Sequence, residues 1–295
     1  MLPIIRWRKI WFALSGFLIA SSLVMLAVRG LKMGTDFTGG SLLEYEYQDS
    51  TPDIAVIRSN ISELGFEGFN IQPYGEKGVL VRAPELKEAD HQKILQAFEG
   101  KGEEKRFESV GPTIGKELRR TTFYATILVV IFILLYVSWA FRKVTQFGKI
   151  NAWVYGAVTV IALFHDIIIL TGAFVIIGHY FGVEVDTSFV AALLTTLGYS
   201  VNDTIVVFDR IRENLLKSST GETFSQIAEK SVNETLARSL STSFTAVLTL
   251  MAMFLFGGET IRYFVLALII GITAGTYSSI FLASPLLVWW EKRQF

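Results

Sequence analysis

Six apolar segments, each long enough to cross a lipid bilayer, dominate this chain of 295 residues. A membrane-spanning helix needs about 20 predominantly apolar residues, and 51% of the residues here are hydrophobic. We therefore expect an α-helical membrane protein with six transmembrane helices. These predicted helices cover residues 10–29, 121–141, 150–177, 187–208, 239–256 and 262–290.

The first apolar segment follows a basic start that contains Arg6, Arg8 and Lys9. A cleaved signal peptide starts in the same way, but its apolar core has only about 7–15 residues and precedes a small-x-small cleavage motif. Here the uncharged run from Ile10 to Val28 is longer, and Ala27-Val28-Arg29 at its end makes a poor cleavage site. We predict an uncleaved membrane anchor.

The polar segment 30–120, between the first two apolar runs, has the pattern of a small α+β domain. Its predicted order is strand, helix, strand, strand, helix, strand, which is typical of ferredoxin-like domains. The strands are expected at 42–47, 69–73, 78–82 and 105–110, and the helices at 51–64 and 86–98. The stretch Asp36–Gly40 before the first strand is either a tight turn or a phosphate or cation loop, and turn geometry explains its glycines.

Basic residues in short loops mark the cytoplasmic side of a membrane protein. Six crossings put the basic stretches of this chain on one side, namely 1–9, 142–149, 209–238 and the tail 291–295. We expect this side to be the cytoplasm, with both termini there and the domain 30–120 extracytoplasmic. Lys116, Arg119 and Arg120 beside the second helix favour the opposite orientation, but the length of the domain outweighs them.

Charge and residue content argue against several classes of function. The 27 basic and 27 acidic residues cancel, so nothing indicates a nucleic-acid partner. The chain has no cysteine and only three scattered histidines, which argues against disulfides, thiolate nucleophiles and metal sites. The external segment offers no nucleophile-base pair and no phosphate loop. We expect no enzymatic activity, no cofactor and no metal, and we interpret the domain as a binding or coupling module.

Asp203 is the only charged residue of the fourth apolar segment. An ionised carboxylate at the membrane centre costs about 2.5–3.5 kcal/mol to insert. Helical spacing puts other polar side chains on the same face, namely Thr195, Thr196, Tyr199 and Asn202. Asp203 either holds a neighbouring helix by a hydrogen bond or binds and releases a proton. We favour proton exchange, because burial disfavours the charged form.

Three further ionisable residues complete a predicted proton relay of Asp203, Asn202, His165, Asp166 and Arg238. His165 and Asp166 lie within the third segment, and their side chains point about 100° apart, so they cannot both face one partner. One of the two is a candidate for a structural role. Arg238 either marks the cytoplasmic end of the fifth helix or provides a counter-charge, since serines and threonines follow it into the helix.

Four stretches resemble the SecD/SecF family of bacterial protein-export membrane proteins, which belongs to the RND superfamily. They are Asp36–Gly40, His165-Asp166, Gly198–Asn214 and Ala237-Arg238-Ser239. The stretch through Asp203 is highly specific, and the likeness covers nearly the whole chain. It implies an RND-like half, with six helices and one external domain between the first two.

The resemblance also implies a function in protein export. The chain would act with a SecD partner, the SecYEG translocon and the SecA ATPase on an unfolded preprotein, using the proton motive force across the cytoplasmic membrane. Asp203 and Arg238 would be needed for proton flow. Related transporters contain two such repeats, whereas this chain has one, which agrees with a separate SecD subunit.

Two other functions are compatible with buried charges in membrane helices. An RND-like proton-driven exporter of lipids or small molecules would need a large external domain with an apolar cleft, which about ninety residues hardly provide. A purely structural scaffold would carry inert charges. Replacement of Asp203 by Asn separates these functions, because a scaffold keeps export intact whereas a relay loses its proton-dependent part.

Overall fold

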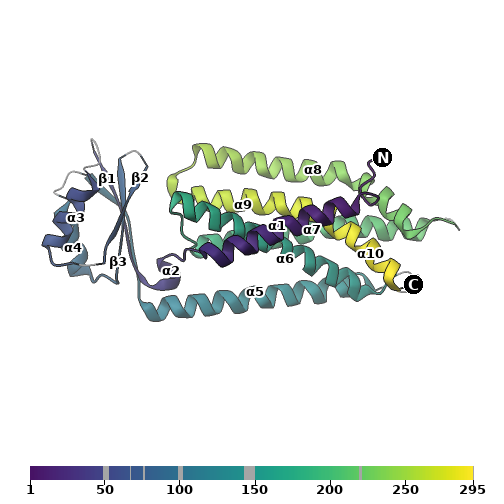
Figure 1. Ribbon diagram of the computed structural model, residues 1–295, viewed down its shortest axis with the longest axis horizontal. Coiled ribbons are helices and arrows are strands. Elements are labelled where there is room, and N and C mark those ends of the chain that lie inside the picture. The colour runs from purple at the N-terminus through teal and green to yellow at the C-terminus, as the bar shows by residue number, and fades with distance from the viewer. Residues whose placement is uncertain are drawn as a thin grey trace. The chain divides into compact units, whose positions relative to one another are not determined.

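The computed structural model describes residues 1–48, 53–66, 68–75, 77–98, 102–142, 150–218 and 221–294. The chain divides into two compact units. One comprises Met1–Lys32 with Ala125–Phe295 and holds most of the long helices, and the other, Met33–Tyr124, contains the sheet (Figure 1).

In the part of the chain that the structure describes, six helical segments are long and apolar enough to cross a membrane, which agrees with the predicted number. The first five are α1 (Arg8–Arg29), α5 (Pro112–Ala140), α6 (Ala152–Phe181), α7 (Thr187–Lys217) and α8 (Phe224–Phe256). The sixth contains a π-helical turn between two α-helices, namely α9 (Glu259–Tyr277), η2 (Ser278–Ala283) and α10 (Ser284–Gln294). A π-helical turn is rare and often occurs at functional sites.

Local sequence sets where several of these helices begin and end. Asp186 caps α7 by accepting a hydrogen bond from the backbone N–H of Phe189 at 2.9 Å. Thr223 and Gln226 form a capping box at the start of α8. Gly182 ends α6 in the left-handed conformation, with φ at 72°.

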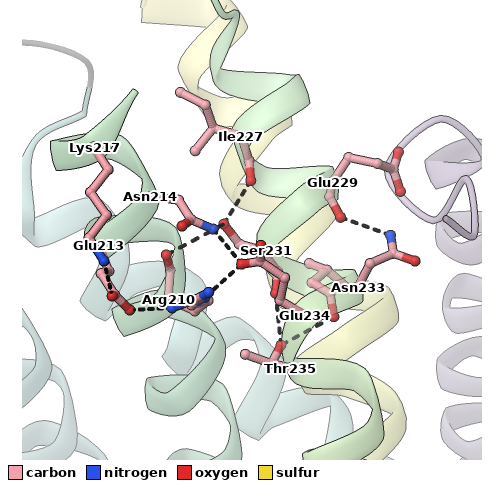
Figure 2. A network of polar contacts seen from close by, with 11 residues as sticks. Arg210, Glu213, Asn214, Lys217, Ile227, Glu229, Ser231, Asn233, Glu234 and Thr235 are labelled. Carbon is pink, nitrogen blue, oxygen red and sulfur yellow. Dashed lines mark hydrogen bonds and ion pairs between the residues drawn. The ribbon is translucent and has the colours of Figure 1, made fainter. Parts of the chain in front are cut away.

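The segment 209–238, expected as a charged loop, is mostly helical. Helix α7 continues to Lys217, and α8 already begins at Phe224. Its charges form ion pairs along and between the two helices, including Arg210 with Glu213 and Glu234 (Figure 2). Apolar side chains such as Ile211 are buried there. The charged residues of this segment indicate an aqueous location. They do not prevent helix formation, because the apolar face of each helix is covered.

Both marked chain ends, the end of α7 and the start of α8 lie at the same end of the helical unit (Figure 1). The N-terminal residues are held there by α8. The Glu229 carboxylate accepts hydrogen bonds from the backbone N–H groups of Ile5 and Arg6, at 3.1 and 3.2 Å. Asn233 binds the backbone N–H and carbonyl of Leu2. Residues 143–149, most of the predicted basic loop, lie outside the described residues.

The second unit has the predicted ferredoxin-like order of elements. Its strands and its two longer helices are β1 (Gly40–Tyr47), α3 (Ile54–Glu63), β2 (Asn70–Tyr74), β3 (Gly78–Ala83), α4 (Glu88–Ala97) and β4 (Gly102–Val110). The strands form an antiparallel sheet in the order β2-β3-β1-β4, and α3 and α4 cover one face (Figure 1). Residues 51 and 52, the predicted start of the first helix, lie outside the described residues; Asp53 caps α3.

The alternating pattern of β1 fills the core of this unit. Leu43, Tyr45 and Tyr47 point into the same cluster as Ile61 of α3 and Ile94 of α4. The spacing of two residues in a strand and of three to four in a helix therefore predicts which side chains are buried.

The stretch Asp36–Gly40 is a turn. Helix α2 (Thr35–Thr38) is a single turn, and Gly39 and Gly40 follow it with φ at 78° and 129°. A Cβ atom on Gly40 would lie 2.7 Å from the carbonyl oxygen of Ala83. The backbone conformation and this close approach account for both glycines.

Candidate functional site: two buried carboxylates

Asp203 lies where α7, α8 and η2 meet. Asp203 is buried, with only 8% of its surface exposed. Ser239 of α8 donates a hydrogen bond to Oδ1 at 2.5 Å, and Ser279 of η2 donates one to Oδ2. Both carboxylate oxygens are therefore held by hydroxyl groups from other elements.

Asp166 is a second buried carboxylate, on α6, and is 5% exposed. Its Oδ2 accepts hydrogen bonds from Ser200 of α7 at 2.6 Å and from Ser278 of η2 at 2.8 Å. Its Oδ1 lies 2.9 Å from Nδ1 of His165. Serines from other elements thus bind both carboxylates: Ser200 of α7 and Ser278 of η2 bind Asp166, and Ser239 of α8 and Ser279 of η2 bind Asp203.

His165 faces a different neighbour from Asp166, as their helical spacing predicts. Its ring stacks on Tyr277, with 5.8 Å between the ring centroids. Tyr277 in turn shares a hydrogen bond with Ser15, the buried serine of α1. The buried Nε2 of His165 has no hydrogen-bond partner among the described residues. His165 thus links Asp166 to the α1 side of the unit.

Arg238 and Asn202 lie outside this buried cluster. Both residues are exposed. Within the described part of the chain, no ion pair joins Arg238 to Asp203, whose partners are serine hydroxyls instead. The polar face predicted on α7 is also divided, because Thr196 is buried whereas Thr195 is exposed.

Sequence reasoning did not identify Ser278 and Ser279 as partners of the carboxylates. These adjacent serines interrupt an apolar segment, which is the one signal that the sequence offers. A regular α-helix predicts only which face each residue occupies, and the π-helical turn changes that spacing. Their placement therefore depends on a backbone feature that residue periodicity does not reveal.

Small residues, Gly271 and Gly275, bring α9 close to α7 beside this cluster. A Cβ atom on Gly275 would lie 2.8 Å from Cβ of Ser200, and one on Gly271 would collide with Thr196. Glycine at these positions allows the close helix contact. It also brings η2 to the two carboxylates.

The hydroxyl-rich surroundings suit both protonation states of a carboxylate. A serine hydroxyl donates to an ionised carboxylate and accepts from a protonated one. An ionised carboxylate in such a setting needs donors for its oxygens, because burial without partners is costly. The serine hydroxyls can therefore hydrogen-bond either carboxylate in both protonation states.

Further hydroxyl groups continue from Asp203 along α8 and α9. Ser243 of α8 accepts hydrogen bonds from Tyr199 at 3.2 Å and from Thr276 at 2.6 Å. In the part of the chain that the structure describes, no group of three or more acidic or histidine side chains has metal-binding geometry.

The chain matches two models of one protein family. Residues 90–293 match the model described as protein export membrane protein SecD/SecF, C-terminal, and residues 24–51 match the SecD/SecF GG motif. The protein translocase subunit SecF of Thermobaculum terrenum is 43% identical and is aligned over 100% of this chain and 96% of its own length. SecF of Desulfurispirillum indicum is 39% identical, over 99% and 92% of the two chains.

A solved structure has the same fold. The crystal structure of SecDF, a translocon-associated membrane protein from Thermus thermophilus, superposes with a TM-score of 0.85 at 32% sequence identity. The match covers 99% of this chain and 39% of the SecDF chain. This chain thus spans well under half of SecDF.

The fold and these matches define a multi-pass membrane component of protein export, consistent with the cytoplasmic membrane. The chain belongs to the SecD/SecF family. Within that family it is of the SecF type, a transport subunit that assists protein export and is not an enzyme. The family and the SecDF structure imply an association of SecDF type.

Proposed function

We propose that this chain uses the proton motive force to promote preprotein export, with Asp203 as its central proton-binding group. The observation that carries the proposal is the buried Asp203 carboxylate, which serine hydroxyls from α8 and η2 hold. The relay comprises Asp203, Asp166 and His165 in the buried cluster, with Asn202 and Arg238 at its exposed margin.

The energy available from protons is sufficient for such a function. One elementary charge that crosses the membrane releases about 2.3 kcal/mol per 100 mV. A few protons per cycle therefore supply enough free energy to change the conformation of an external domain. Protonation of Asp203 removes a buried charge, and the helices around it respond to that change.

The exposed polar residues near Asp203 support SecD as the partner. Exposed hydroxyl and cationic side chains follow one face of α8 at helical spacing, namely Arg238, Ser241, Thr242, Thr245 and Thr249. Polar side chains at membrane depth face protein or water rather than lipid. A second membrane subunit on this face covers them and brings Asn202 and Arg238 into the proton path.

The topology follows from the basic segments. Residues 1–9, the helical ends within 209–238 and the C-terminal tail face the cytoplasm, and the unit built from the domain 30–120 is extracytoplasmic. There it meets the unfolded preprotein, while SecYEG and SecA are the remaining partners. The common location of both marked termini, the end of α7 and the start of α8 supports this arrangement (Figure 1).

The test compares Asp203→Asn with a matched neighbour, Thr204→Val. Thr204 is also buried on α7, but its hydroxyl donates only to the backbone carbonyl of Ser200 among the described residues. Export of a preprotein into membrane vesicles is measured with and without an uncoupler, at equal protein levels. Asp203→Asn should lose the uncoupler-sensitive part, and Thr204→Val should keep it. If the Asp203→Asn variant keeps full uncoupler-sensitive export, the proposed proton-driven function is contradicted, and the alternative of a purely structural scaffold is favoured.

A further inference from the structure

Two neighbouring serines of η2 contact two different carboxylates. Ser278 donates a hydrogen bond to Asp166 on α6, and Ser279 donates one to Asp203 on α7. All four residues are buried. A displacement of this single turn therefore changes the hydrogen bonds of both carboxylates.

Each of these hydroxyl groups also has a second acceptor within its own helix. The Oγ of Ser278 lies 3.1 Å from the carbonyl oxygen of Gly275, and that of Ser279 lies 3.0 Å from the carbonyl oxygen of Thr276. A hydroxyl has one proton to donate. When Asp203 takes up a proton, its O–H donates to Ser279, and the hydroxyl proton of Ser279 turns to the carbonyl of Thr276. Ser278 and Asp166 have the same two arrangements.

The π-helical backbone ties the two serines together. Its wider turn closes with bonds between residues five apart, and the hydroxyl of Ser284 donates to the carbonyl of Ser279 at 3.0 Å. Helix α7 adds a second link, since Ser200 binds Asp166 one turn before Asp203. The hydrogen bonds of Ser278 and Ser279 therefore switch between the carboxylates and the helix carbonyls as a group, and not independently of each other.

We propose that Ser278 and Ser279 are positioning residues that couple protonation of Asp166 to protonation of Asp203. The coupling rests on the proposed function, because it concerns the same proton relay. Neutralisation of one carboxylate reorganises η2 and changes the proton affinity of the other. Reciprocity requires that each carboxylate affects the other equally.

Few other charged or titratable groups surround the pair. The titratable side chains in the middle of the helices packed around them include His165 on α6, Tyr199 on α7 and Tyr277 on α9, and Arg238 lies on α8 one residue before Ser239. Of these, His165 contacts a carboxylate directly in the described structure, and Tyr199 binds Ser243 instead. The serine pair of η2 is therefore one of two polar links between the carboxylates, beside Ser200 of α7.

Carbodiimide labelling measures this coupling residue by residue. Dicyclohexylcarbodiimide adds to protonated carboxyl groups in apolar surroundings, and mass spectrometry of the α6 and α7 peptides separates Asp166 from Asp203. The full chain is labelled with its SecD partner in native membranes over a pH series. The pH midpoint of labelling is recorded for Asp166 in Asp203→Asn and for Asp203 in Asp166→Asn.

We expect each neutralisation to move the other midpoint by about one pH unit, the size of one lost hydrogen bond to a charged group. The shift should disappear in Ser278→Ala and Ser279→Ala, and it should return in the corresponding Thr variants, which keep a hydroxyl. Thr159→Val is the matched control, because this buried hydroxyl of α6 donates to the backbone of Tyr155 at 2.8 Å.

Two results would overturn the coupling. One is that the pH midpoint of labelling of the remaining carboxylate is unchanged in both Asp→Asn variants. This result does not depend on whether the serine variants fold. The other is a midpoint shift that persists in the Ser278→Ala, Ser279→Ala double variant. Labelling is independent of export: coupled midpoints with normal proton-dependent export in Asp203→Asn contradict the proposed function alone. Uncoupled midpoints with lost export contradict the coupling alone.

Discussion

Ser239 on α8 donates a hydrogen bond to Asp203 on α7, with 2.5 Å between Oγ and Oδ1. We expect Ser239→Ala to lower the free energy of unfolding by about 1–3 kcal/mol, because it leaves a buried acceptor without its donor. Uncoupler-sensitive export should fall as well. Thermal unfolding of the purified protein and export into vesicles measure the two effects. Ser241→Ala, at an exposed position on the same helix, should leave the free energy of unfolding unchanged; an equal loss of stability in both variants would contradict a specific role of Ser239.

Gly275→Ala should destabilise the contact between α7 and α9. The new Cβ would lie 2.8 Å from Cβ of Ser200, and overpacking of this kind costs about 1–3 kcal/mol. Gly198→Ala is the matched control on α7, because nothing lies within 4 Å of the new atom there. Unfolding temperatures in detergent should fall for Gly275→Ala only. Similar stability of the two variants would mean that α9 and α7 can separate without loss.

The ends of α7 and α8 should loosen when Glu234 is neutralised. Its Oε2 accepts hydrogen bonds from Arg210 at 2.6 Å and from Asn214 at 2.7 Å (Figure 2). For a partly exposed network we expect a loss of about 1 kcal/mol in Glu234→Gln. Trypsin should then cleave faster after Lys217, and high salt should reduce the difference between variant and wild type. Glu222→Gln serves as control at an exposed position, and faster cleavage there too would exclude a role for this network.

Glu44 should make the stability of the ferredoxin-like unit depend on pH. Burial raises the pKa of Glu44 above its ordinary value, while the guanidinium of Arg106, 3.8 Å from Oε1, lowers it in part. A raised pKa means that the folded state binds the proton more tightly, so stability decreases as the pH rises through the folded pKa. We expect Glu44→Gln to reduce that decrease.

Hydrogen exchange of β1 in the full chain, measured over a pH series from about 4 upward, tests the role of Glu44. Glu63→Gln on α3 is the control, because that side chain is exposed. An unchanged pH dependence in Glu44→Gln would show that another group is responsible.

Much of the fold follows from residue spacing. The order of strands and helices along the second unit could be predicted because Leu43, Tyr45 and Tyr47 alternate and Ile57 and Ile61 recur at helical spacing. The six membrane helices follow from their length and apolarity. The helical ends within 209–238 were missed, since charge density resembles that of a loop until the ion pairs between α7 and α8 are known.

The site could be predicted only in part. Asp203 and Asp166 stand out because a carboxylate is rare in an apolar segment. The positions of their partners Ser278 and Ser279 depend on the π-helical turn, which residue spacing does not predict. Arg238 was a candidate counter-charge, yet hydroxyl groups occupy the contacts of Asp203 in this structure.

The attachment of the N-terminal residues to α8 constrains the order in which the protein is completed. Ile4 and Ile5 are buried, and Glu229, which accepts a hydrogen bond from the backbone N–H of Ile5, lies 224 residues further along the chain. Residues 2–6 are synthesised long before α8. Residues 2–6 therefore cannot bind α8 until the intervening helices have been synthesised. Their docking on α8 is a late step of biogenesis.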